Sequence, residues 1–443
     1  MMVRMAAQST FPHEIRIFLA TEALAQSRPM NALREAEQAV LAESQAWALR
    51  RLTERLQQEA NAMEALCPKT GQPLTNTRWR AMTLHTVSGV IALRVRHGYA
   101  EALHEWVCPA RIAWGLQEHQ RVSPELQARV CYTSTQTGSF EKAAAMAQCW
   151  GTAVSDDLIH HHVQQCGAAA TQLSLPTPPV AVHEPEFSLV IMMDGWMARE
   201  RGPDWGASPR KKAPERIAWH EIKSAVIYRL DQRAQKDSGR GLLLEKYIVA
   251  CPPDTAPVDF GAAVEAEARR RGLGRAKLVY LVMDGAIWLW DLAKDRFGAA
   301  VKTLDFHHAS EHLWAVGRVL YGEGSAETTA WVESLLHGLR HGQQARVVRR
   351  LQELITPTAP RSADAQNVIE REAHYFKNHE THMNYKAIHR AGAPIGSGAV
   401  ESLGAQLQRR FRCSGQFWQR PGLSHLLKLA VTFRNHDDSY LWN

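Results

Sequence analysis

The sequence contains no CxxC pair, no long apolar run and no continuous apolar core near its start. No apolar stretch reaches the roughly 18 residues that a membrane-spanning helix requires, so no membrane segment is expected. The first residues, MMVRMAAQSTFPHE, lack the apolar centre of a secretory signal. Scattered cysteines in odd number indicate free thiols in a reducing, cytoplasmic compartment. The seven cysteines are Cys67, Cys108, Cys131, Cys149, Cys166, Cys251 and Cys413.

The chain is long enough for more than one folded domain. Its 443 residues and 45% hydrophobic content indicate about two or three globular domains. The formal net charge of +7 favours a polyanionic partner, most often nucleic acid. Proteins that bind no polyanion can be equally basic, so the charge is supporting evidence only.

Residues 1–66 are predicted to form an N-terminal helical region. Leu33, Val40 and Trp47 recur at seven-residue spacing, and no proline interrupts residues 31–66, which predicts one long helix there. The apolar stripe is typical both of a coiled-coil contact and of a helix packed on its own domain, and both alternatives stay open.

Residues 67–115 are predicted to form a small β segment with a turn near Ser88-Gly89. Cys67 and Cys108 flank this segment, as the paired corners of a zinc ribbon would. Thr70 and Arg111 stand where the second cysteine of each corner belongs. The segment is therefore a degenerate zinc-ribbon-like one, and a four-ligand zinc site is not expected.

Residues 116–173 are predicted to form a helix-turn-helix-like DNA-binding domain. A short helix begins near Ser139 and closes at Gly151, and Ser155 caps a second helix. This outline occurs in DNA-reading modules and also in purely structural helix pairs, so both interpretations stay open. Three consecutive histidines, His160 to His162, point in different directions from the second helix, so a shared metal is not expected.

A proline-rich linker at 174–187 precedes a new pattern of strands and helices. Between residues 188 and 313, three predicted strands are followed by helix, strand, helix and strand, which indicates an α/β layout around a mixed sheet. Residues 314–390 are predicted to form a helical insertion. Residues 391–443 then begin with a glycine-rich turn, IGSGAVE, that leads into a helix.

Three carboxylates stand at the ends of these predicted elements. Asp194 and Asp284 each follow a buried-type strand, and Glu401 lies on the helix after the glycine-rich turn. One Asp-Gly pair alone is an ordinary turn signal, but three carboxylates at element ends can converge on one side of a sheet. Divalent cations remove the repulsion between clustered carboxylates, and oxygen ligands favour Mg²⁺ or Mn²⁺. Two such ions would support phosphoryl transfer without a side-chain base.

Several stretches resemble the DDE-type transposases of bacterial insertion sequences, most closely the ISKra group. The resemblance covers roughly residues 120–443 and more loosely the N-terminal part. Relatives often carry paired cysteines there, which this chain lacks. The matching stretches are MMDGW (192–196), LVMDGAIWLW (281–290), TLDFHHASEHL (303–313), IGSGAVES (395–402) and SGQFWQRPG (414–422).

The resemblance implies a ribonuclease-H-like catalytic core with a helical insertion, preceded by a mainly α N-terminal DNA-binding region. It implies that Asp194, Asp284 and Glu401 hold two Mg²⁺ or Mn²⁺ ions. It also implies that Asp305 and His308 form an Asp-x-x-His signature, with His308 near the scissile phosphate. Alternatively, Asp305 only caps the following helix, and His308 and His312 are first-turn residues or a zinc pair without a third ligand.

Basic residues and one tryptophan are the predicted DNA contacts. The charge run after Glu401 favours phosphate contacts over a solvated helix face. Trp418 suits either stacking on a displaced base or a place in the core. The predicted contacts are Arg210, Lys211, Lys212, Arg409, Arg410, Arg412 and Trp418.

These features predict a transposase that cleaves DNA at the inverted repeats of its element and joins the strand to target DNA. Pairing of two element ends implies a homodimer or higher oligomer, and the resemblance implies a bacterial, nucleoid-associated protein. The alternatives are a ribonuclease-H-like nuclease or resolvase that cuts without joining, and a domesticated DNA-binding protein without catalysis. A glycosidase-type carboxylate pair suits the basic flanks less well.

Overall fold

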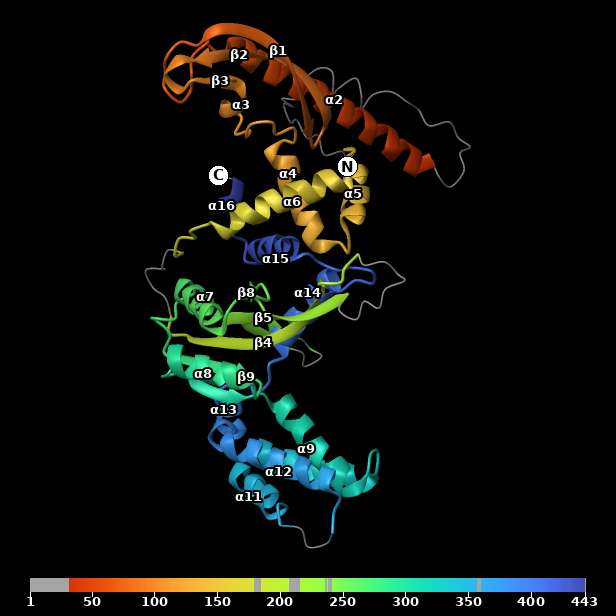
Figure 1. The fold of residues 1–443 in the computed structure, drawn as a ribbon, viewed down its shortest axis with the longest axis vertical. Helices are drawn as coiled ribbons and strands as arrows, with labels where there is room; N and C mark the ends of the chain where they lie inside the picture. Colours follow the sequence, from red (N-terminus) through yellow and green to blue (C-terminus); the bar gives the residue numbers. More distant parts are fainter. Residues whose placement is uncertain are drawn as a thin grey trace, which may run out of the picture. The chain divides into compact units, whose positions relative to one another are not determined.

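The computed structural model describes residues 32–178, 185–206, 216–235, 237, 241–356 and 360–442. The chain divides into two compact units, Met1–Arg121 and Val122–Asn443, and Figure 1 shows the elements of both. Within these described ranges, no helix is long and apolar enough to cross a membrane. The domain boundaries expected from the sequence remain predictions.

The first unit contains one long helix and a three-stranded sheet. The predicted long helix is confirmed, and its second half packs Leu49 and Leu56 against the buried side of the hairpin. Its first half exposes Leu33 and Val40, and a coiled-coil contact of this half stays a prediction. The predicted hairpin is also confirmed, because Thr86 pairs with Gly89 across the turn. The elements are α2 (Ala32–Ala62), β1 (Thr75–Thr86), β2 (Gly89–Ala100), η1 (Glu101–Leu103), β3 (Glu105–Val107) and α3 (Pro109–Ala113).

The two cysteines that flank this sheet are buried in separate apolar clusters. Cys67 lies in a tight turn, in which the Thr70 and Gly71 amides donate to its carbonyl oxygen. Arg111, where a second zinc ligand would stand, donates to the carbonyl oxygens of Gln117 and Gln120. Hydrogen bonds from an arginine therefore hold a loop at the position that a metal would organise in a zinc ribbon.

The second unit begins with three helices, α4 (Pro124–Gln136), α5 (Phe140–Cys149) and α6 (Asp156–Thr171). The predicted serine caps are confirmed, because Ser139 accepts from the Lys142 amide and Ser155 from the Leu158 amide. α6 packs on α4, α5 and the late helix α15 (Arg420–Arg434). The helix pair is thus fixed to α15, and its role in DNA reading remains a prediction.

A five-stranded mixed sheet forms the centre of this unit, in the order β10-β9-β4-β5-β8. β4 pairs antiparallel with β5, and β5 with β8, whereas β4, β9 and β10 run parallel. The predicted succession of three strands, helix, strand, helix and strand is confirmed, and the fold is α/β with a ribonuclease-H-like core and added helices. The strands are β4 (Ser188–Arg201), β5 (Ile217–Arg229), β8 (Tyr247–Cys251), β9 (Leu278–Met283) and β10 (Val301–Leu304), with a small side hairpin of β6 (Arg233–Gln235) and β7 (Gly241–Leu243).

Helices cover both faces of this sheet. Leu189, Ile191 and Met193 of β4 pack against α7 (Pro257–Arg270) and α8 (Ile287–Arg296), the two crossover helices. Because side chains alternate along a strand, Asp194 and Trp196 face the other side. Trp196 contacts Phe411 of α14 (Gly398–Phe411) there, so Asp194 lies on the face that carries the glutamate helix.

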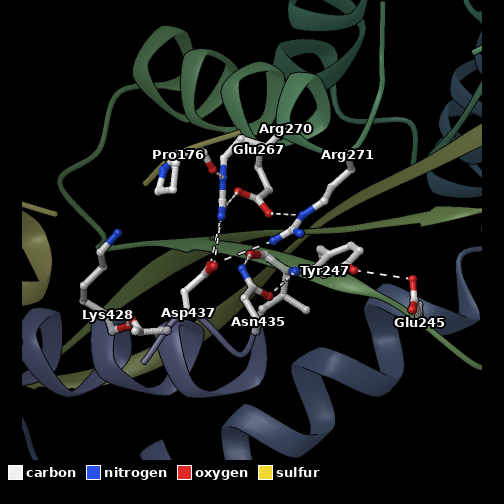
Figure 2. A network of polar contacts seen from close by, with 11 residues as sticks. Pro176, Glu245, Tyr247, Glu267, Arg270, Arg271, Lys428, Asn435 and Asp437 are labelled. Atoms are coloured by element: carbon white, nitrogen blue, oxygen red, sulfur yellow. Dashed lines mark hydrogen bonds and ion pairs between the residues drawn. The ribbon is translucent and has the colours of Figure 1, made fainter. Parts of the chain in front are cut away.

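The end of α15 is tied to β8 and α7 by the polar network in Figure 2. The Asn435 side chain accepts from the Ile248 amide at 2.8 Å and donates to the Ile248 carbonyl at 2.9 Å, as a neighbouring strand would. Arg270 donates to Asp437 at 2.9 Å and to Glu267 at 2.7 Å. Both carboxylates are buried, so the ion pairs compensate for their desolvation.

Within the described residues, the helical character predicted for residues 314–390 is confirmed. These helices enclose a core of their own, in which Phe306, Leu313, Phe376 and Tyr385 are buried together. The elements are α9 (Phe306–Tyr321), α10 (Ala326–Arg340), α11 (Gln344–Glu353), α12 (Ala363–Asn378), η2 (Glu380–His382) and α13 (Tyr385–Arg390), and the chain ends with α16 (Ser439–Trp442).

Candidate active site

Three aspartates lie side by side where the parallel pairing of the strands ends. The prediction that the first strand ends at Asp194 is wrong, because β4 continues to Arg201 in its pairing with β5. Met193 pairs with Met283, so the next residues, Asp194 and Asp284, are neighbours. Leu304 also pairs with Met283, and the Asp305 amide continues the ladder by donating to the Met283 carbonyl. The common direction of β4, β9 and β10 therefore brings all three carboxylates to one edge.

Asp305 links this edge to the loop before α14. Its buried carboxylate accepts from the backbone amides of His307, His308 and Ser397. It therefore caps α9, as one alternative expected, and it also fixes the glycine-rich turn. The Ser397 hydroxyl in turn donates to Glu401 at 2.5 Å. Asp305 thus has a positioning role for the glutamate.

The electrostatics of Asp194 reveal which groups surround it. The pKa of Asp194 is raised to about 6, chiefly by burial and then by the nearby charges of Asp284 and Glu401, against the lowering effects of the Gly195 amide and His308. Asp284, Glu401 and His308, whose charges act on Asp194, are all side chains that the sequence predicted for the site. Residues that are more than 200 positions apart in the chain therefore share one electrostatic environment.

Each carboxylate of this group has one oxygen held by a local donor. Asp194 accepts from the Gly195 amide, Asp284 from the Ala286 amide, and Glu401 from Ser397. The second oxygen of each has no hydrogen-bond partner among the described residues. Hard oxygen donors of this kind suit Mg²⁺ or Mn²⁺. However, no three acidic, histidine or cysteine side chains in the described ranges are close enough to hold one ion, so the free oxygens must move together to share one.

Two of the predicted DNA contacts are wrong. Arg410 is 4% exposed, and its guanidinium donates to the Ser134 and Gly138 carbonyls at the end of α4. Trp418 is 8% exposed, and its indole donates to the Phe411 carbonyl, so the core alternative holds for it. The Arg410 side chain joins α4 and α5 to the core, and Trp418 packs on Phe411. Neither side chain is available to a phosphate or a base.

Two other predicted contacts, Arg409 and Arg412, are exposed on or beside the end of α14. Arg210, Lys211 and Lys212 lie outside the described residues. The remaining basic predictions therefore stay proposals, and two of them have the exposure that a phosphate contact needs.

A cluster of arginine and aromatic side chains that the sequence reasoning missed lies at the outer end of the β4–β5 hairpin. Trp219 is 48% exposed, and the guanidinium carbons of Arg199 and Arg412 lie 5.9 and 5.1 Å from its ring centre. Arg199 donates to the Arg412 and Cys413 carbonyls, which fixes this arrangement to the end of α14. The cross-strand pairing of Arg199 with Trp219 depends on hairpin register, which the sequence does not specify there.

No protein-family model matches the chain, and no curated protein does. Among solved structures, the Drosophila P element transposase strand transfer complex aligns with 75% of this chain and 96% of its own, at 10% identity and a TM-score of 0.34. NurA with manganese aligns with 63% of this chain and 59% of its own, at 14% identity and a TM-score of 0.11. Likenesses this low carry no argument about chemistry.

Proposed function

We propose that this protein is a DDE-type DNA transposase similar to those of the ISKra group. It would cleave DNA at the inverted repeats of its element and join the exposed 3′ end to target DNA. The observation that carries the proposal is the gathering of Asp194, Asp284 and Glu401 at one edge of a ribonuclease-H-like sheet, where burial and the charges of the other two carboxylates raise the pKa of Asp194. A carboxylate cluster of this kind suits hard cations and phosphate chemistry.

Each group of residues at the site would have a separate role. Asp194, Asp284 and Glu401 would hold two Mg²⁺ or Mn²⁺ ions, which would supply activation of the attacking oxygen and neutralisation of the leaving one. Asp305 and Ser397 keep Glu401 oriented through the bonds described above. His308, whose charge acts on Asp194, would donate a hydrogen bond to a phosphate oxygen.

The DNA would approach over the end of α14. Arg409 and Arg412 are exposed there, and Trp219 offers a ring for an unpaired base beside them. The helix pair α5–α6 would contribute to recognition of the element end. The first turn of α6 carries Asp156 and Asp157, so we place the phosphate contacts of the helix pair away from that turn.

Joining of two element ends requires two copies of the site, and we propose a dimer or higher oligomer. The first half of α2, with its exposed Leu33, Val40 and Leu41, is the contact surface that we propose for it. A cytoplasmic, nucleoid-associated location follows from the same proposal.

The test separates nicking from joining. Purified protein is incubated with Mg²⁺ and labelled DNA from the flanks of its gene, and both the nicked strand and the strand-transfer product are measured. Asp284→Ala and Asp194→Ala should abolish both products, while Asp291→Ala, at an exposed position of α8, should leave both unchanged. Nicking without joining would favour a nuclease, and binding without either product would favour a domesticated DNA-binding protein. Undiminished cleavage by Asp284→Ala would refute the site.

A further inference from the structure

Two aromatic side chains outside the carboxylate group clamp the Asp284-Gly285 turn. The Trp290 indole of α8 donates to the Asp284 carbonyl at 2.9 Å. On the other side, the ring edge and hydroxyl of Tyr375 on α12 occupy the space that a side chain at Gly285 would need. The helical insertion therefore touches the turn that carries Asp284.

The Tyr375 ring is held from behind by a hydrogen-bonded histidine and glutamate. It stacks on the His312 ring with centres 3.8 Å apart and an angle of 23° between the planes. His312 is hydrogen-bonded through Nδ1 to Glu372, which is 1% exposed and also accepts from Arg371. Burial alone would raise the pKa of Glu372, but the hydrogen bonds from His312 and Arg371 hold it below its ordinary value. The hydrogen bond between His312 and Glu372 thus fixes the His312 ring, and the stacking fixes the Tyr375 ring.

The Tyr375 hydroxyl lacks a partner in this setting. It is buried and makes no hydrogen bond with any described residue. A buried hydroxyl without a partner is destabilising, so such a group in a native structure calls for an acceptor. Burial, followed by the charges of Asp284, Glu372 and Asp305, raises the pKa of Tyr375 well above its ordinary value. The phenol therefore keeps its proton and can donate it to an acceptor nearby.

We infer that Tyr375 is a positioning residue of the carboxylate site, whose hydroxyl donates to the Asp284 carboxylate when a cation draws the free oxygens of the site together. The donor would fix the oxygen of Asp284 that has no protein partner, in the orientation that a cation requires. The inference rests on the proposed function, because it assigns Tyr375 to the same site. It makes the insertion part of the cation site, since α12 supplies the donor.

The test replaces only the hydroxyl. Tyr375→Phe keeps the ring and its stacking, and Tyr385→Phe is the matched control, because Tyr385 is a buried phenol of the same insertion whose hydroxyl also lacks a partner among the described residues. Mn²⁺ affinity is measured by calorimetry, alongside Mg²⁺-dependent nicking. Removal of an outer partner of a metal ligand typically weakens metal binding about tenfold to 100-fold. Tyr375→Phe should show a loss in this range in both measurements, with an unchanged thermal midpoint.

Three outcomes would overturn the inference, and they are distinguishable. Wild-type Mn²⁺ affinity in Tyr375→Phe, together with its loss in Asp284→Ala, would refute the role of the tyrosine and leave the carboxylate site intact. Unchanged Mn²⁺ affinity in Asp284→Ala would refute the carboxylate site and the inference together. An equal loss in Tyr375→Phe and Tyr385→Phe would show a general effect of buried phenols and would also overturn it.

Discussion

Replacement of Asp194 by asparagine should stabilise the cation-free protein while it removes activity. Asparagine keeps the shape of the side chain and its acceptor for the Gly195 amide, but it carries no charge. In the native state the pKa of Asp194 is raised from its ordinary 3.8 to about 6 by burial and by its acidic neighbours. Ionisation therefore costs free energy in the folded state that it does not cost in the unfolded chain.

The magnitude follows from the two pKa values. The difference corresponds to an upper bound of roughly 3 kcal/mol, and because the side chain is only part-buried, solvent reduces it to about 1–2 kcal/mol. The raised native pKa means that the folded protein binds the proton more tightly. The stability contribution of Asp194 is thus fully present below about pH 3.8 and is lost as the pH rises through about 6.

The assay is urea unfolding in a chelator, followed across that pH window. Wild-type protein should lose about 1–2 kcal/mol of stability between about pH 4 and pH 8 relative to Asp194→Asn, and Mg²⁺ should restore stability to the wild type alone. Asp291→Asn, an exposed aspartate on α8, serves as the control and should follow the wild type. A pH profile of Asp194→Asn that equals the wild-type profile would refute the reasoning.

Further predictions concern the DNA surface, the clamp and its support. Trp219→Ala should weaken binding of a single-stranded oligonucleotide roughly fivefold to tenfold, as measured by fluorescence anisotropy. Trp106→Ala, at an equally exposed and arginine-stacked tryptophan of the first unit, should leave this binding unchanged. Equal effects of the two substitutions would refute a specific role of Trp219 in base stacking. Gly285→Ala should reduce nicking at least about tenfold, because the added methyl group would overlap Tyr375. Gly274→Ala places its methyl group in open space and should nick DNA as the wild type does. Wild-type nicking by Gly285→Ala would show that the contact with Tyr375 has no role. Glu372→Gln should destabilise the protein by about 1–3 kcal/mol in thermal unfolding, and no loss would contradict the role of the buried ion pair.

The sheet and the strand-end aspartates could be predicted because their signals are local. A short apolar run before Asp-Gly marks each strand, and the parallel direction of β4 and β9 then makes Asp194 and Asp284 neighbours. Asp-Gly marks the end of β9 only, since β4 continues to Arg201. The helix caps at Ser139 and Ser155 were predictable for the same reason. In each case the residues that determine the feature lie within a few positions of one another.

The burial of Arg410 shows what charge counting misses. The run of arginines after Glu401 predicted a phosphate-binding face, but Val400, Leu403 and Leu407 define a buried stripe at helical spacing. Residue 410 falls on that stripe, so the period alone places its side chain inward. Its carbonyl acceptors come from α4, which is more than 270 positions away along the chain, and no local pattern indicates them.

The Tyr375 clamp could not be predicted from the sequence. Tyr375 lies in an ordinary amphipathic helix, and its meeting with Gly285 depends on how the insertion folds back onto the strand ends. Trp290 lies at the end of the matching stretch LVMDGAIWLW, but no role was predicted for it. Contacts between elements of different origin in the chain need the tertiary structure, which is why the positioning side chains escaped the sequence analysis.

The side chain of Asn435 has a consequence for how the protein fails. β8 is an outer strand of the sheet, and Asn435 occupies both backbone hydrogen-bonding groups of Ile248, the second residue of that strand. A chain shortened before this residue would present β8 as an open template for another β8. Such a truncated protein should therefore be lost to self-association through its strands before any defect in DNA chemistry could be observed.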